Sequence, residues 1–201
     1  GNSRSAFRAV NIDLTKPVTM AVISGAHVNS WYNTAVLITL ISSDSLSGMA
    51  QTIYRLERSG VLISSGAYTA PLEANADGQY SVYYYGVDKA GNSEVETLAT
   101  FKIDRTQPRV NYMLVPAGNV SDWNNTAVQV VFSGTDTLSG IVECSSGAVA
   151  LENKGQQIAG WCRDAAGNIG YSTATLNIDL TQPTVSVIQA PEKNSYGWNN
   201  T

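Results

Sequence analysis

Aspartate is the most regularly spaced chemically active residue in this chain, because it recurs inside three short motifs. These motifs are I-D-x-T-x-P, with Asp13, Asp104 and Asp179; D-x-L-S-G, with Asp44 and Asp136; and D-x-A-G-N, with Asp88 and Asp164. Carboxylates at turn positions accept hydrogen bonds from the backbone N–H groups of their own turn. Where several carboxylates converge, they bind a hard cation such as Ca²⁺. Which chemistry applies depends on whether the fold brings the three motifs together.

The remaining residues do not support a catalytic mechanism. The chain has 1 histidine, His27, which has no counterpart in the second copy of the surrounding motif. Nucleophilic catalysis of the Ser–His–Asp or Cys–His type needs a histidine beside a nucleophile and an orienting acid. The aspartates repeat along the chain, whereas active sites are rarely duplicated in every unit of an array. We therefore expect no enzyme activity and a surface position for His27.

The two cysteines allow one pairing. Cys144 and Cys162 lie 18 residues apart, in segments with the composition of strands. An even cysteine count in a chain of extracellular character favours a disulfide. On the chain-entropy model, closing a loop of this length stabilises the folded state by about 3 kcal/mol. Two buried free thiols are the alternative.

Aromatic residues form a second candidate site. Side chains two residues apart point to the same face of a strand, so Tyr83 and Tyr85 share one face, and Trp161 lies at a similar place in a later strand. If this face is exposed, it is a candidate ligand platform. Ordinary cross-strand aromatic packing is the alternative.

The elements that position these residues follow from an internal repeat. Residues 29–48 (NSWYNTAVLITLISSDSLSG) match residues 121–140 (SDWNNTAVQVVFSGTDTLSG), and a third copy begins at residues 196–201 (YGWNNT). The aspartates of I-D-x-T-x-P are 91 and 75 residues apart, so the second unit is 16 residues shorter. The predicted organisation is two complete units, 15–104 and 105–180, between the last strand of a preceding unit (1–14) and the start of a following unit (181–201). The chain is then an excerpt of a longer array.

Each unit is predicted to consist of short β-strands. Segments such as VTMAVIS (18–24) and QYSVYYYGVD (79–88) are rich in β-branched and aromatic residues, and Gly, Asn, Asp and Ser clusters separate them. No segment has the apolar spacing of an amphipathic helix over three turns. Roughly six or seven strands per unit predict an all-β fold of tandem immunoglobulin-like β-sandwiches.

The order of the motifs resembles a known family. A Trp-Asn-Thr segment, D-x-L-S-G, a tyrosine-rich strand ending in YGVDKAGN and then FKIDRTQP follow one another. This order is similar to that of the bacterial immunoglobulin-like repeats of large cell-surface and secreted proteins, over nearly the whole chain. The resemblance implies an extracellular or cell-surface location and a role as a stalk, an adhesin module or an accessory domain beside an enzyme. The second unit departs from the first because it is shorter and carries both cysteines.

The expected fold also predicts where the aspartates meet. In an immunoglobulin-type sandwich, the loop after the second strand and the last hairpin loop lie at the pole where the chain enters. The predicted trios are Asp13, Asp44 and Asp88 at the first unit and Asp104, Asp136 and Asp164 at the second. Converging carboxylates repel one another unless a cation or hydrogen-bond donors neutralise them. The two hypotheses are a Ca²⁺ ion at each junction and turn capping by each aspartate.

The composition limits the classes of partner that the chain can bind. The chain of 201 residues carries 12 Lys and Arg against 16 Asp and Glu, a net charge of −4. Without a dense basic run, this balance argues against nucleic-acid binding, and no apolar stretch reaches the length of a membrane span. We predict a non-catalytic spacer that positions a terminal domain of a bacterial surface or secreted protein, with neighbouring repeats as its partners. The alternatives are an adhesin or carbohydrate-binding module for a surface glycan or protein, and an accessory domain of a polysaccharide-degrading enzyme.

Overall fold

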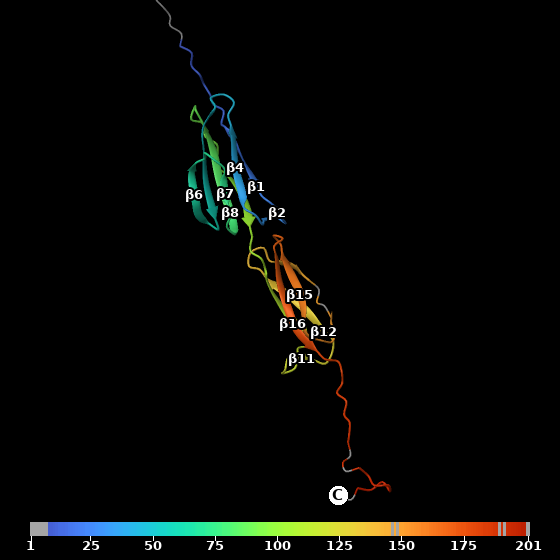
Figure 1. Ribbon diagram of the computed structural model, residues 1–201. Coiled ribbons are helices and arrows are strands. Elements are labelled where there is room, and N and C mark those ends of the chain that lie inside the picture. Colours follow the sequence, from blue (N-terminus) through green and yellow to red (C-terminus); the bar gives the residue numbers. More distant parts are fainter. Residues whose placement is uncertain (1–7, 146, 148, 189, 191, 200–201) are drawn as a thin grey trace, which may run out of the picture.

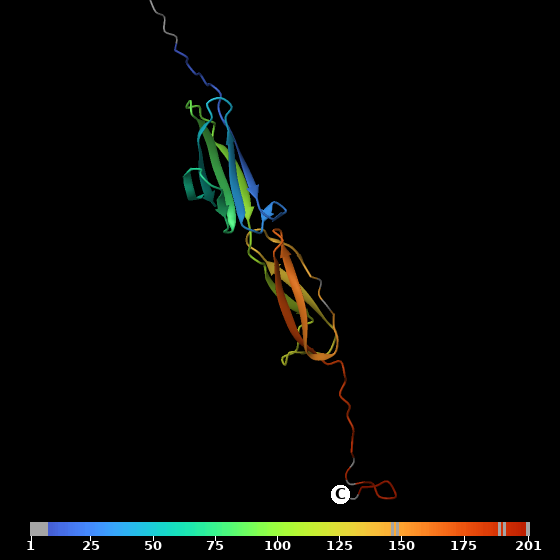
Figure 2. The same ribbon diagram turned by 45° about the horizontal axis from the view of Figure 1, so that its top comes forward.

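The structure, a computed structural model, describes residues 8–145, 147, 149–188, 190 and 192–199. The described residues form two β-sandwiches that lie end to end along one axis (Figures 1 and 2), so the all-β prediction is confirmed. Residues 8–17 lead into the first sandwich and residues 179–188 leave the second, both without a partner strand. Within the described ranges, no helix has the length and hydropathy needed to cross a membrane.

The first sandwich packs a three-stranded sheet against a six-stranded sheet. The three-stranded sheet has the order β1 (Val18–Ser24), β4 (Val36–Ser43) and β7 (Leu72–Ala74). The six-stranded sheet has the order β2 (His27–Val28), β3 (Trp31–Tyr32), β9 (Thr97–Ile103), β8 (Gly78–Asp88), β5 (Met49–Arg58) and β6 (Val61–Ala67). Strand β3 pairs in parallel with β9, and the other pairs are antiparallel. This division of strands between two mainly antiparallel sheets is the immunoglobulin-type arrangement.

The second sandwich repeats this topology with fewer strands. One sheet has the order β10 (Arg109–Val115), β12 (Val128–Thr135) and β14 (Val149–Ala150). The other has the order β11 (Trp123–Asn124), β16 (Ile169–Ile178), β15 (Asn153–Asp164) and β13 (Ile141–Cys144). Strands β2 and β6 have no counterpart in this sheet order, and β13 (4 residues) is shorter than β5 (10 residues), the strand at its place in the first sandwich. The prediction of two tandem sandwiches is confirmed.

Alternating side chains build each core. Along β8 the burial alternates residue by residue, because side chains two apart point to the same face. The first core contains Val36, Ile38, Leu40, Leu56, Ala74, Tyr80, Val82, Tyr84, Phe101 and Ile103, and the second contains Val128, Val130, Phe132, Ala174, Leu176 and Ile178. The described residues thus form one core per sandwich.

Two facing core positions differ in side-chain size between the two sandwiches. Gly160 of β15 leaves room for the ring of Phe132, because a Cβ atom on Gly160 would overlap that ring. The corresponding positions of the first sandwich hold Tyr84 and Leu40, both buried. The large aromatic ring has therefore moved from one sheet to the other. Since interiors are close-packed, each core needs its own pair.

Candidate functional sites

The structure brings the three aspartate motifs together at the entry pole of each sandwich. Carboxylate oxygens of Asp13, Asp44 and Asp88 all lie within 4.8 Å of one another at the first pole. The same limit holds for Asp104, Asp136 and Asp164 at the second pole. The second trio lies between the two sandwiches, because Asp104 belongs to the linker that joins β9 to β10.

Backbone N–H groups cap the two loop aspartates of the second trio. Asp136 Oδ1 accepts hydrogen bonds from the N–H groups of Leu138 (3.0 Å) and Gly140 (2.9 Å). Asp164 Oδ1 accepts one from the N–H of Asn168, and its Oδ2 accepts one from Asn168 Nδ2, both at 2.8 Å. Each motif therefore stabilises its own turn, as one of the two hypotheses expects.

Asp104 connects these turns to the linker. Its Oδ1 accepts from the N–H of Thr106 (3.1 Å), and its Oδ2 accepts from the N–H of Ser139 (3.0 Å) in the D-x-L-S-G loop. Its carbonyl oxygen accepts from Asn168 Nδ2 (3.0 Å) in the D-x-A-G-N loop. Both loops of the second sandwich thus hold the residue at which the chain leaves the first one.

The same network is present at the first pole. Ser47 N–H donates to Asp13 Oδ2 (2.9 Å), and Asn92 Nδ2 donates to the carbonyl of Asp13 (3.1 Å) and to Asp88 Oδ2 (2.7 Å). The serines and asparagines that make these bonds were not among the predicted site residues. They could have been found, because they are the Ser of D-x-L-S-G and the Asn of D-x-A-G-N, which recur with the aspartates.

The two poles differ in burial and therefore in electrostatics. Asp104 is 0% exposed, and burial raises its pKa, with hydrogen bonds from Ser139 and Thr106 offsetting only part of the effect. Asp13 is half-buried, and hydrogen bonds from Ser47 and Thr15 lower its pKa. At Asp88, burial favours the neutral acid, but hydrogen bonds from Asn92 outweigh burial and lower the pKa. The sandwich that covers the second trio is the cause of the difference at Asp104.

The trio geometry also fits the chemistry of a hard cation. Three carboxylates converge within the distance that a shared ion requires, and Ca²⁺ accepts such oxygen ligands in flexible geometry. At the first pole, Asp44 Oδ2 is buried and has no hydrogen-bond partner in the structure. The aspartates are arranged for turn capping, and one oxygen of the first trio, Asp44 Oδ2, remains free to ligate.

The linker is also held by the sandwich that precedes it. The N–H of Asp104 donates to the carbonyl of Tyr32 (2.9 Å), which extends the parallel pairing of β3 with β9. The N–H of Arg105 donates to Asp77 Oδ1 (2.8 Å), and the hydroxyl of Thr106 donates to Asp77 Oδ2. Residues 104–106 are therefore bonded to both neighbours.

The two sandwiches also contact each other directly. Asn33 Nδ2, just after β3, donates to the carbonyl of Ala166 (2.9 Å), and Asn29 Nδ2 lies 3.4 Å from the carbonyl of Ala165. Ala166 is 0% exposed, whereas its counterpart in the first unit, Ala90, is exposed. The D-x-A-G-N loop of the second unit is thus covered by the far pole of the first.

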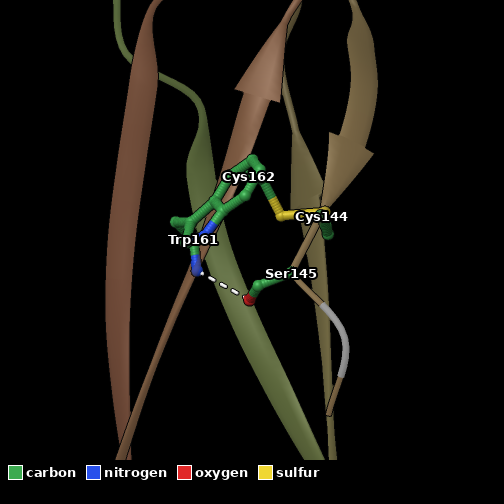
Figure 3. The surroundings of a disulfide bond; sticks show 4 residues. All are labelled: Cys144, Ser145, Trp161 and Cys162. Atoms are coloured by element: carbon green, nitrogen blue, oxygen red, sulfur yellow. Dashed lines mark hydrogen bonds between the residues drawn. A yellow bond between two sulfur atoms is a disulfide. The ribbon is translucent and has the colours of Figure 1, made fainter.

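Cys144 and Cys162 form a disulfide between β13 and β15 (Figure 3). They are direct partners in one sheet, with Cα atoms 4.0 Å apart, so the bridge lies within a sheet rather than between the two. Next to it, the N–H of Trp161 donates to Ser145 Oγ (3.0 Å), as Figure 3 shows. The corresponding place in the first sandwich holds hydroxyls instead, with Ser42 Oγ and Thr52 Oγ1 2.6 Å apart.

The aromatic residues of the second candidate site lie on the outward faces of their strands. Tyr83 and Tyr85 alternate with the buried residues of β8, and Trp161 alternates with those of β15. The guanidinium of Arg55 lies 3.8 Å from the ring centre of Tyr83 and pairs with Glu57 and Glu96. Arg55, Tyr83, Tyr85 and Glu96 border a shallow hollow of about 330 Å³, and Trp161 lies outside it. His27 is exposed, with its ring centre 5.2 Å from that of Tyr32.

Comparisons with known proteins give structural matches at low sequence identity. No protein-family model and no curated protein matches the chain. Among solved structures, one match comes from work on host cell surface retention of a 1.5-MDa bacterial ice-binding adhesin, with 13% identity and a TM-score of 0.41. It covers 83% of this chain, which spans just under two thirds (66%) of the adhesin chain. Another is the fibronectin(III)-like modules of Clostridium thermocellum CbhA, with 13% identity, a TM-score of 0.37, and coverage of 84% of this chain and 100% of that chain.

Proposed function

We propose that this chain is a non-catalytic spacer of a bacterial surface or secreted protein, built from units 15–104 and 105–180. The observation that carries the proposal is the linker of residues 104–106, which is hydrogen-bonded to both sandwiches. A linker fixed on both sides transmits orientation from one unit to the next, which a spacer needs. The disulfide supports an extracellular location, because such bonds persist in oxidising compartments.

Small-angle X-ray scattering tests this function. The full chain is expected to give the distance distribution of a narrow, elongated particle. The matched control carries a Gly-Ser-Gly insertion between Thr106 and Gln107, which leaves both sandwiches intact and lengthens the linker. We expect the insertion to broaden the distribution. Identical distributions for the two proteins would contradict a stiff spacer.

The outward aromatic face favours a second candidate function, glycan binding. Its supporting observation is the hollow bordered by Arg55, Tyr83, Tyr85 and Glu96. Aromatic rings and charged groups at a shallow surface suit a sugar ring, but Arg55 already covers Tyr83 and is neutralised by two acids. Binding to a glycan array that is lost in Tyr85→Ala would support this function. An equal signal from the variant would leave the face as cross-strand packing.

The Ca²⁺ hypothesis stays a prediction within the spacer function. An ion held by Asp104, Asp136 and Asp164 would add a bond between the linker and the second sandwich. The hydrogen bonds of these residues already hold the linker without an ion. The ion would therefore increase the stiffness of the junction rather than create it.

A further inference from the structure

The far pole of the second sandwich has the same design as the pole of the first that is already covered. Asn125 follows β11 as Asn33 follows β3, within the repeated segment N-T-A-V. The N–H of Asp179 donates to the carbonyl of Asn124 (2.9 Å), as the N–H of Asp104 donates to that of Tyr32 (2.9 Å). The hydroxyl of Thr181 donates to Glu152 Oε1 (2.9 Å), as that of Thr106 donates to Asp77. The departing chain is thus oriented alike at both poles.

The two far poles differ in what covers them. At the far pole of the second sandwich there is a hollow of about 450 Å³, with a lining that includes Trp123, Asn125, Asp179 and Thr181. At the junction between the sandwiches, Asn33 donates to the carbonyl of Ala166, and Val28 lies against Gly167. The tip of the D-x-A-G-N loop, residues 165–167, therefore covers Asn33, and Asn33 corresponds to Asn125 in the lining of the hollow.

We propose that the hollow of the second sandwich is the docking site for the D-x-A-G-N loop of a further unit of the same kind, following Asp179 in the chain. Asn125 Nδ2 donates to the loop carbonyl that corresponds to Ala166, and the loop asparagine donates to the carbonyl of Asp179. The serine N–H of the unit's D-x-L-S-G loop donates to Asp179 Oδ2. This inference rests on the spacer function and names the residues that extend its junction.

The direction of the departing chain favours this occupant over a second molecule. Residues 179–188 leave along the long axis of the second sandwich in both views (Figures 1 and 2). Residues 194–198 also repeat a turn of the second unit. The N–H of Asn194 donates to the carbonyl of Trp198 (2.9 Å), as that of Asn119 donates to Trp123 (2.8 Å). One turn of the segment after Asp179 thus has the local structure of the corresponding turn in the second unit.

A lengthened chain tests the proposal. A second copy of residues 105–179 is inserted after Asp179, so that every junction keeps its I-D-x-T-x-P sequence, and both chains are studied by NMR. In the lengthened chain, we expect the NMR signal of the original Asn125 side-chain amide to shift from its position in the two-unit chain. We also expect this amide to exchange with water as slowly as the Asn33 amide, which is at a covered junction in both chains. The Asn125 of the added copy is the internal control, because its own pole stays uncovered. An original Asn125 amide unchanged from the two-unit chain would overturn the proposal.

Substitution and concentration complete the test. Asn125→Ala in the original unit is expected to let the added unit reorient independently, as measured by ¹⁵N relaxation, while Asn33→Ala frees the first junction. Equal tumbling with and without Asn125→Ala would contradict the role of this residue. The same amide shift in the unlengthened chain at rising concentration would assign the hollow to a second molecule and overturn the in-chain occupant. A loose added unit beside a rigid first junction would reject this inference and leave the spacer function standing.

Discussion

Gly134 and Cys162 face each other across the two sheets of the second sandwich, with no room for a side chain at position 134. A Cβ atom built on Gly134 would lie 2.9 Å from both the Cβ and the Sγ of Cys162. In the repeat, Ser42 and Gly86 stand at the corresponding positions of the first sandwich. The Ser42 hydroxyl is hydrogen-bonded to those of Thr19 and Thr52, and a Cβ atom on Gly86 would meet Thr19, Glu94 and Met49 instead. The glycine of this pair is therefore on opposite sheets in the two units.

The first prediction is that Gly134→Ala destabilises the second sandwich. The added methyl group must displace the disulfide, and overpacking of this kind costs about 1–3 kcal/mol. Chemical denaturation measures the change. Ser133→Ala is the matched control, because its side chain is exposed on the opposite face of β12. Equal free energies of unfolding for the two variants would contradict the prediction, because the two sheets would then accommodate the added methyl group without loss of stability.

The second prediction concerns the disulfide. Replacing Cys144 and Cys162 by alanine should lower the free energy of unfolding of the second sandwich by about 3 kcal/mol, because the unfolded chain gains the entropy of an open loop. Calorimetry of the full chain measures both sandwiches at once. The first sandwich contains no cysteine and serves as the internal control. If the second sandwich of the variant unfolded at the same temperature as in the native chain, the prediction would be contradicted.

The third prediction is that Asn168→Ala weakens the junction. Asp164 is 2% exposed and would lose the donor to its Oδ2, and the carbonyl of Asp104 would lose the same donor. An unsatisfied buried polar group costs about 1–3 kcal/mol. Denaturation should show this loss in the second sandwich, and NMR relaxation should show independent motion of the two units. Asn92→Ala removes the same bonds at the first pole, so it should destabilise the first sandwich and leave the junction rigid.

The two strands whose residue ranges were predicted from the sequence alternate in burial. Val18–Ser24 was predicted with the bounds that the structure has and alternates between exposed and half-buried residues, and the prediction of 79–88 is one residue short of β8. Strand β6 was missed. It lies at the edge of its sheet with nearly every residue exposed, so no face is buried and no period-two pattern exists.

A site could be predicted from the sequence where it follows from the fold of one sandwich, and not where it depends on contact between two sandwiches. Convergence of the aspartates was deducible, because three motifs recur in order and the fold class assigns their loops to one pole. The bond from Asn33 to Ala166 was not deducible, because it depends on how one complete sandwich is oriented on the next. Sequence repetition identifies equivalent positions, and only the three-dimensional arrangement tells which of them meet.

The fourth prediction is that Asp13 and Asp104, although equivalent in sequence, titrate on opposite sides of the ordinary pKa of 3.8. Carboxyl ¹³C NMR with a chelator present measures both midpoints. The raised pKa of Asp104 means that the folded state binds its proton more tightly than the unfolded chain. Its stabilising contribution is therefore complete below 3.8 and is lost as the pH rises through the folded-state pKa.

The lowered pKa of Asp13 acts in the other direction. Its contribution to stability is complete above 3.8 and is lost as the pH falls through the folded-state pKa. The Gly-Ser-Gly insertion after Thr106 should separate the two sandwiches and let solvent reach Asp104. We therefore expect the titration midpoint of Asp104 to move toward that of Asp13. Equal midpoints for the two aspartates in the native chain would contradict burial as the cause.

The fifth prediction is that Ca²⁺ raises the unfolding temperature of both sandwiches. An ion that binds only the folded state stabilises it with increasing concentration, by about 2.7 kcal/mol at 100 times the dissociation constant. Calorimetry with added Ca²⁺ and with chelator measures the shift. Asp136→Asn removes one carboxylate from the second trio, so it should abolish the shift of the second sandwich and leave that of the first. Asp122→Asn, which changes the same charge at an exposed residue outside both trios, should change neither. Unfolding temperatures that stay constant up to millimolar Ca²⁺ would assign all six aspartates to turn capping alone, because their backbone and asparagine donors then suffice to neutralise them.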